Sequence, residues 1–267
     1  MCKRNTDDPL MRTFLDRYYL HLLSVPRENV AIGDLYPHDG KRVSTPGKVM
    51  DFLTPPLEMP PLNIGEHMAD VSGTMSNGIS IQQGLGFLEG FLTALGALGI
   101  LNKVRANYEL KKASSMKFRF AHATRDSVNA FELGSKLIRH KVMEDHPLYE
   151  KGYRYYLVTA VARTPSISIM AENDEDKAVT IDVGAMELGE VTTGITVEKS
   201  SETEVTFIGK KSLAFGVELY ELTYDPKRSK LKLKIPEGLI KVRGNSEIPV
   251  KPAFIGGPND DIFLDVE

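Results

Sequence analysis

The sequence predicts an α+β fold, a twisted and mainly antiparallel sheet with surrounding helices and a short C-terminal tail. Apolar and polar residues alternate through much of the second half of the chain, which is the pattern of half-buried strands. Helical periodicity is confined to shorter stretches, and the C-terminal segment is rich in proline and glycine. The 267 residues are 42% hydrophobic and 26% charged, which is typical of a soluble chain that can bury a core.

The first element expected is an amphipathic helix over residues 9–25. Leu10, Phe14, Tyr18 and Leu22 recur at spacings of four, so they share one face of a helix. This face would pack against the rest of the domain.

Two further segments lie between this helix and the first expected strands. Residues 37–61 hold six prolines and predict an irregular, ordered loop that wraps the body. Residues 79–101 form the most apolar run, but Gln82, Gln83 and Glu89 interrupt it. Because a spanning helix needs about 20 predominantly apolar residues, a buried helix is the favoured interpretation.

A period of two then begins, and residues 103–122 are expected to form a hairpin. One of its faces is apolar and the other is cationic. The cationic side chains are Lys103, Arg105, Lys111, Lys117 and Arg119.

The remaining elements follow in order. Residues 126–145 return to a helical pattern, and residues 154–188 predict a second strand pair joined by the acidic turn 172–177. Residues 202–225 and 230–236 add strands of the same kind.

Several classes of site lack a sequence signal. The six histidines show neither an HExxH pattern nor paired Cys/His spacing, so no metal site is predicted. The glycines at 84, 86 and 90 depart from the dinucleotide fingerprint, no GxSxG elbow occurs, and no cofactor is expected. The net charge of −3 and the lack of a long basic run disfavour nucleic acid as a partner.

The single cysteine, Cys2, excludes an internal disulfide and favours a cytoplasmic location. It has three interpretations. It is inert, or it is the nucleophile of an N-terminal-nucleophile amidohydrolase, or it carries an acyl chain. The charges of Lys3 and Arg4 next to it favour the thiolate, which suits acylation.

The end of the chain differs in charge from the rest. Residues 244–267 carry one basic and five acidic residues, a net charge of −4, so residues 1–243 carry +1 of the total of −3. Removal of such a tail would change how the body meets an anionic surface.

Together these parts, in this order, resemble the bacterial gasdermins. The matching segments are VPRENVAIGDLYP, YRYYLVTAVARTPSISIMAE and GKKSLAFGVELYEL, with the near-terminal cysteine, the first helix and the acidic tail. The resemblance implies a pore-forming protein of antiphage defence, not an enzyme. It would be cytoplasmic and monomeric when inactive, and it would form a large homo-oligomeric pore in the inner cell membrane after cleavage.

The resemblance also implies roles for particular residues. Residues 1–243 would be the pore-forming domain, and residues 244–267 the autoinhibitory peptide. Cys2 would carry a palmitoyl group, and a caspase-like or trypsin-like protease would cut the chain at Lys241, Val242, Arg243, Gly244 or Asn245. The expected autoinhibitory contacts are Phe254, Ile255, Ile262, Phe263 and Leu264.

The two expected hairpins, near 103–122 and 154–188, have the length that membrane insertion needs. A transmembrane strand takes about 9 to 11 residues, and a closed barrel leaves no backbone group unpaired in lipid. The same alternation also fits an ordinary sheet with one solvated face. The residues expected in inserting strands are Val104, Tyr108, Leu110, Phe118, Phe120, Tyr156, Val158, Ile167, Ile169, Val179, Ile181 and Val183.

Overall fold

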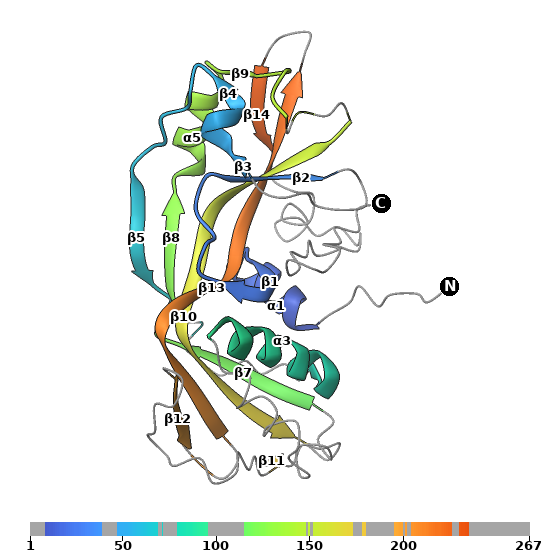
Figure 1. The fold of residues 1–267 in the computed structure, drawn as a ribbon, viewed down its shortest axis with the longest axis vertical. Coiled ribbons are helices and arrows are strands. Elements are labelled where there is room, and N and C mark those ends of the chain that lie inside the picture. The colour runs from blue at the N-terminus through green and yellow to red at the C-terminus, as the bar shows by residue number, and fades with distance from the viewer. Residues whose placement is uncertain are drawn as a thin grey trace, which may run out of the picture.

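The fold is a mainly antiparallel sheet flanked by helices, which confirms the predicted fold class (Figure 1). The structure is a computed structural model. It describes residues 9–38, 47–68, 71, 79–95, 115–147, 149, 152–172, 178–179, 195–199, 201, 204–225 and 230–234. Within these residues, twelve strands form one sheet and two short strands form another.

Two long antiparallel strands form the centre of the sheet. β10 (Arg154–Glu172) and β13 (Glu204–Asp225) pair from Tyr155 opposite Leu222 to Met170 opposite Glu204. They run the length of the molecule, and their register shifts near the middle (Figure 1). We call this pair the central ribbon.

Shorter strands flank the central ribbon on both sides. On the side of β10 lie β7 (Ser115–Ala121), β8 (Thr124–Val128) and β2 (Asp34–His38), followed outward by β6 (Ile79–Ser80), β5 (Leu62–His67) and β3 (Gly47–Lys48). On the side of β13 lie β12 (Ile195–Lys199), β1 (His21–Arg27) and β14 (Lys230–Lys234), while β11 (Ala178–Val179) pairs with the end of β10. The second sheet consists of β4 (Leu53–Thr54) and β9 (Lys141–Val142).

The first helix is shorter than the sequence predicts. α1 (Pro9–Tyr18) is followed by Tyr19, whose φ of 56° is left-handed, and the chain then enters β1. Leu22 therefore lies in a strand opposite Gly216, although it packs in the same core as Phe14. The spacing of four continued past the helix because residues of both elements face one core.

The other helices lie within or near their predicted segments. α3 (Ile81–Ala94) confirms the buried helix, with Phe91 fully buried. α5 (Ala130–Leu137) covers only the middle of the stretch 126–145, because Val128 still belongs to β8. Among the described residues, the prediction of an irregular loop over residues 37–61 holds only for residues 55–61. Residues 47–54 form the short elements β3, α2 (Val49–Phe52) and β4, and residues 37–38 end β2.

The two ends of the central ribbon differ in how they are covered. The upper half is the end of the ribbon where Tyr155 pairs with Leu222 (Figure 1). There, Tyr155 and Leu157 pack in one core cluster, whereas Tyr156 and Val158 pack in another. Both faces are therefore buried, which explains the nearly continuous apolar run YYLVTAVA. In the lower half, apolar and polar residues alternate because the two faces have different surroundings.

Candidate membrane-inserting sheet

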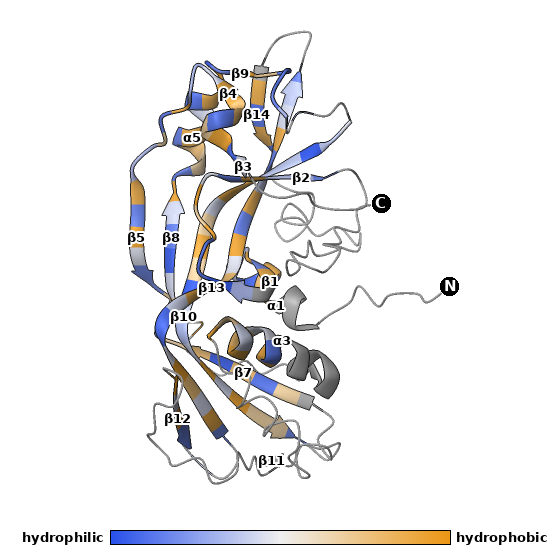
Figure 2. Cartoon of the chain, viewed as in Figure 1, coloured by the Kyte–Doolittle hydropathy of each residue, from blue (hydrophilic) through white to orange (hydrophobic). Residues whose placement is uncertain are grey.

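The lower sheet is the candidate site. We define it as β7, β12, residues 166–172 of β10 and residues 204–208 of β13, which pair with one another. Figure 2 shows hydrophobic and hydrophilic residues alternating along these strands. One face consists of buried apolar side chains, namely Phe118, Phe120, Ile167, Ile169, Ile195, Val197, Val205 and Phe207.

Helices cover this apolar face. The ring of Phe87 in α3 lies 5.5 Å from that of Phe118 and 5.9 Å from that of Phe120. From α1, Phe14 meets Phe120 at 5.6 Å, in an edge-to-face geometry. The apolar face thus has the composition that lipid would accept, but here α3 and α1 occupy it.

The opposite face is polar, and its charges are matched across strands. Lys117 Nζ lies 2.6 Å from Glu172 Oε1, and Arg119 Nη1 lies 3.7 Å from Glu204 Oε1. On the same face, the hydroxyls of Ser168 and Thr206 are 2.7 Å apart. From Lys117 and Arg119, the sequence predicts a cationic face. In its described part, a glutamate lies next to each of these two cations.

A bulge separates the lower sheet from the upper half. Ser166 pairs with Ile208 and Thr164 pairs with Leu213. Residues 209–212 of β13 therefore lie opposite residue 165 of β10 alone. The extra residues 209–212 include Lys210 and Lys211, which are exposed. On β10, the Thr164 hydroxyl donates a 2.7 Å hydrogen bond to the carbonyl of Ala121.

The C-terminal end of α3 rests against this bulge. A Cβ atom added to Gly209 would lie 2.5 Å from Leu95 Cδ2 and 2.9 Å from Leu95 Cδ1. A glycine at this position therefore lets α3 approach the sheet closely.

Two ion pairs and a hydrogen bond connect four segments next to the bulge. Arg125 of β8 contacts Glu218 of β13, and burial raises the pKa of the Glu218 carboxyl although Arg125 opposes the rise. Arg163 Nε lies 3.5 Å from Asp126 Oδ2, and the same guanidinium donates to the carbonyl of Val30. The upper half thus has a fixed polar network directly above the lower sheet.

The family model described as Bacterial Gasdermin Family matches residues 23–230. The chain belongs to this family. A relative named Gasdermin bGSDM from a Vitiosangium species is 26% identical over 223 residues, which are 80% of this chain and 81% of the relative. Another, from Bradyrhizobium tropiciagri, is 26% identical over 273 residues and covers 99% of this chain and 98% of its own.

A solved structure agrees with the fold. The structure of a bacterial gasdermin from Bradyrhizobium tropiciagri superposes with a TM-score of 0.63 at 20% identity, covering 98% of this chain and 97% of that chain. Gasdermins are pore-forming proteins and not enzymes, so membership disfavours an amidohydrolase that uses Cys2.

The expected inserting residues of this gasdermin fall into three groups. Phe118, Phe120, Ile167 and Ile169 lie together on the buried face of the lower sheet. Tyr156 and Val158 lie in the upper half, and Val179 lies in β11, opposite Ala171, so their assignment to inserting strands stays a prediction. The others, Val104, Tyr108, Leu110, Ile181 and Val183, lie outside the described residues, as do the cationic Lys103, Arg105 and Lys111.

The predicted modification and control residues also lie outside the described part of the chain. These are Cys2, the cleavage region Lys241, Val242, Arg243, Gly244 and Asn245, and the tail contacts Phe254, Ile255, Ile262, Phe263 and Leu264. Within the described residues, no helix has the length and hydropathy to span a membrane. The same residues contain no cluster of His, Cys, Asp and Glu that would hold a metal ion.

Sequence reasoning missed the bulge and the ion pairs above it. The segment GKKS (209–212) places three consecutive polar or charged residues in a long stretch where apolar and polar residues otherwise alternate. This break in the alternation is the sequence signal that indicates a bulge. The pairing of Arg163 with the carbonyl of Val30 joins residues 133 positions apart, and nothing local to either residue indicates it.

Proposed function

We propose that this gasdermin is an autoinhibited pore-forming protein of antiphage defence. Cleavage within residues 241–245 by a caspase-like or trypsin-like protease releases residues 1–243 from the tail 244–267. The released body then inserts into the inner cell membrane and oligomerises into a β-barrel pore. Before cleavage the protein is a cytoplasmic monomer.

The covered apolar face of the lower sheet is the observation that best supports this proposal. Its alternation gives each strand one face for lipid and one for water, as a barrel wall requires. In the proposed transition, α3 and α1 leave the face that includes Phe118 and Phe120, and lipid replaces them. Strand edges join between subunits, so backbone donors and acceptors remain paired in the bilayer.

The remaining parts of the proposal concern the two termini. Phe254, Ile255, Ile262, Phe263 and Leu264 hold the tail on the body, and the tail's charge of −4 weakens attraction to anionic lipid until it is removed. A palmitoyl group on Cys2 adds membrane affinity of about 0.8 kcal/mol per buried methylene.

Dye release from anionic liposomes tests the proposal. A specific protease site is introduced at residues 241–245, and the intact and cleaved proteins are compared, with an uncleavable variant treated with the same protease as the control. Leakage after cleavage alone is the expected result. A folded, fully cleaved and acylated protein that releases no dye would contradict the proposal.

A further inference from the structure

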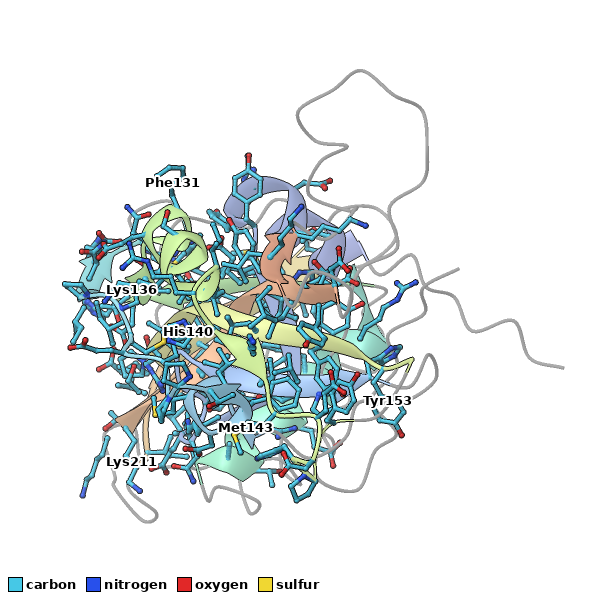
Figure 3. All side chains as sticks on the ribbon, turned by 90° about the horizontal axis from the view of Figure 1, so that it is seen from above. Phe131, Lys136, His140, Met143, Tyr153 and Lys211 are labelled. Carbon is cyan, nitrogen blue, oxygen red and sulfur yellow. The ribbon has the colours of Figure 1, made fainter. Side chains whose placement is uncertain are left out.

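Two exposed lysines, Lys210 and Lys211, lie in the bulge of β13, where the lower sheet meets the upper half. Figure 3 shows the labelled Lys211 at the rim of the molecule, with its side chain pointing outward. Just below the bulge, Phe207 belongs to the buried apolar face of the lower sheet. The lysines therefore stand at the border of the surface that lipid would cover in the proposed function.

An ion pair holds Lys211 in the folded protein. Its Nζ lies 2.9 Å from Glu28 Oε1 and 3.0 Å from Glu28 Oε2, so the ammonium contacts both carboxylate oxygens. The side chain of Lys211 is nevertheless 68% exposed, and that of Glu28 is 42% exposed. A pair as exposed as this adds little to the stability of a fold, so stability is a weak reason for its presence.

The backbone fixes the position of Glu28. This residue directly follows β1, whose last residue, Arg27, lies opposite Ala214 just beyond the bulge. Arg163 of β10 donates to the carbonyl of Glu28 at 3.1 Å and also to the carbonyl of Val30. Glu28 therefore lies on a segment that β1 and Arg163 together hold against the bulge.

The charges around the bulge suit an anionic partner. Residues 26–30 and 209–214, which meet there, hold three basic residues and one acid, Glu28. The carboxylate of Glu28 neutralises the Lys211 ammonium locally. An anionic group that takes the place of this carboxylate would accept charge-assisted hydrogen bonds from the same ammonium.

We infer that Lys210 and Lys211 bind the phosphate groups of anionic lipids, and that Glu28 masks Lys211 until lipid phosphate displaces it. The inference rests on the proposed pore-forming function and specifies which residues meet the headgroups. When the lower sheet enters the bilayer and the upper half stays outside, the bulge lies at the level of the headgroups. Lysine side chains at this level place their ammonium groups among the phosphates while their methylene stems contact apolar surface.

The exposure of the two lysines favours a membrane over a free phosphate ion. Both side chains project from a bulge on the surface, so they do not enclose a small ion. A membrane instead presents many phosphates in one plane, and both lysines bind at once. Each contact then makes the other more favourable, and the attraction of the anionic surface adds to both.

Opposite effects of the two partners test the mask. Proteins carrying Lys211→Gln or Glu28→Gln, cleaved at the introduced site, are compared with cleaved wild type for binding to phosphatidylglycerol vesicles. Lys211→Gln should weaken binding by about fivefold, the contribution of one lysine near an anionic surface. Glu28→Gln should strengthen binding by about two- to fivefold, because Lys211 is then available to phosphate. A pair with a purely structural role would shift binding in the same direction in both variants.

Two further variants are the matched controls. Lys232→Gln in β14 and Glu58→Gln, whose backbone carbonyl contacts α5, remove the same charges from exposed side chains in the upper half. Both should change binding by less than about twofold, because salt screens charges that lie more than about 8 Å from the membrane. Thermal unfolding verifies that all four variants are folded.

The lipid and the buffer identify the source of the phosphate. On vesicles of neutral phosphatidylcholine the differences between the variants and wild type should disappear. Sodium phosphate and sodium chloride at equal ionic strength should weaken binding to anionic vesicles equally. Shifts of Lys211→Gln and Glu28→Gln in the same direction, or no shift in either, would overturn the inference. Differences that persist on neutral vesicles, or stronger competition by phosphate than by chloride, would overturn it as well.

The wild-type arm separates this inference from the proposed function, because vesicle binding and dye release are measured separately. If cleaved wild type binds anionic vesicles without releasing dye, pore formation fails and the binding measurements still decide the role of the bulge. If it releases dye and the variants bind like wild type, the function stands and the inference is wrong. If it binds no anionic vesicles, both are wrong.

Discussion

Glu218 has an unfavourable electrostatic position in the folded protein. Burial raises the pKa of its carboxyl above the usual value of 4.5, although the nearby Arg125 lowers it in part. The folded state therefore binds this proton more tightly than the unfolded state does, and ionisation of Glu218 costs stability as the pH rises from about 4.5 through the raised pKa.

Glu218→Gln should remove this contribution to the pH dependence. We expect the wild type to lose more stability than the variant between about pH 4.5 and pH 7. Urea unfolding at several pH values measures the difference. Parallel pH profiles for the two proteins would show that Glu218 does not titrate in this way.

Gly209 controls how closely α3 meets the bulge of β13. Gly209→Ala places a methyl group where Leu95 now lies, and we expect destabilisation of about 1–3 kcal/mol because neighbouring side chains must move. Gly134→Ala in α5 is the control. Its added Cβ would lie 3.9 Å from the nearest atom, Leu233 Cδ1, so a gain of roughly 0.5–1 kcal/mol is expected. Equal effects in chemical denaturation would contradict the close contact.

At the scale of elements, α3 is the main cover of the lower sheet. Phe91 is fully buried in its core, whereas Thr93 on the same helix is exposed. Phe91→Ala should destabilise the protein by about 3–5 kcal/mol, and Thr93→Ala should change stability by less than about 0.5 kcal/mol.

The same pair tests whether α3 opposes insertion. With α3 held less tightly, the cleaved Phe91→Ala protein should release dye faster than wild type at equal protein concentration, and Thr93→Ala should match wild type. Slower release from a Phe91→Ala sample that is still folded would mean that α3 assists insertion.

At the scale of the whole molecule, the sequence predicts the parts of the fold that depend on local periodicity. Alternation in MKFRFA and SISIMA identifies β7 and lower β10, and even the apolar face with Phe118 and Ile167 follows from it. The pattern fails where two successive elements of different type share one core. Leu22 continues the spacing of α1 but lies in β1, because both elements pack against the same buried face.

Local patterns also cannot show which contacts cover a surface. Phe131 and Ile138 are apolar residues of the stretch with a helical pattern, yet both are exposed, because α5 turns Leu133 and Leu137 inward. The Arg125–Glu218 pair and the Leu95–Gly209 contact form only when β8, β13 and α3 meet in three dimensions.

In the proposed function, α3 leaves the lower sheet before the protein forms a pore. A reversible cross-link between Leu95→Cys and Gly209→Cys tests this step, since Leu95 Cγ, whose place a cysteine Sγ would take, lies 3.3 Å from the position of a Gly209 Cβ. Each single cysteine variant is the control, and peptide mapping verifies the bond. Dye release is measured after cleavage near Arg243, before and after reduction. We expect no leakage while the cross-link is intact and leakage after reduction. Equal leakage from the fully cross-linked and the reduced protein would show that α3 need not leave the sheet.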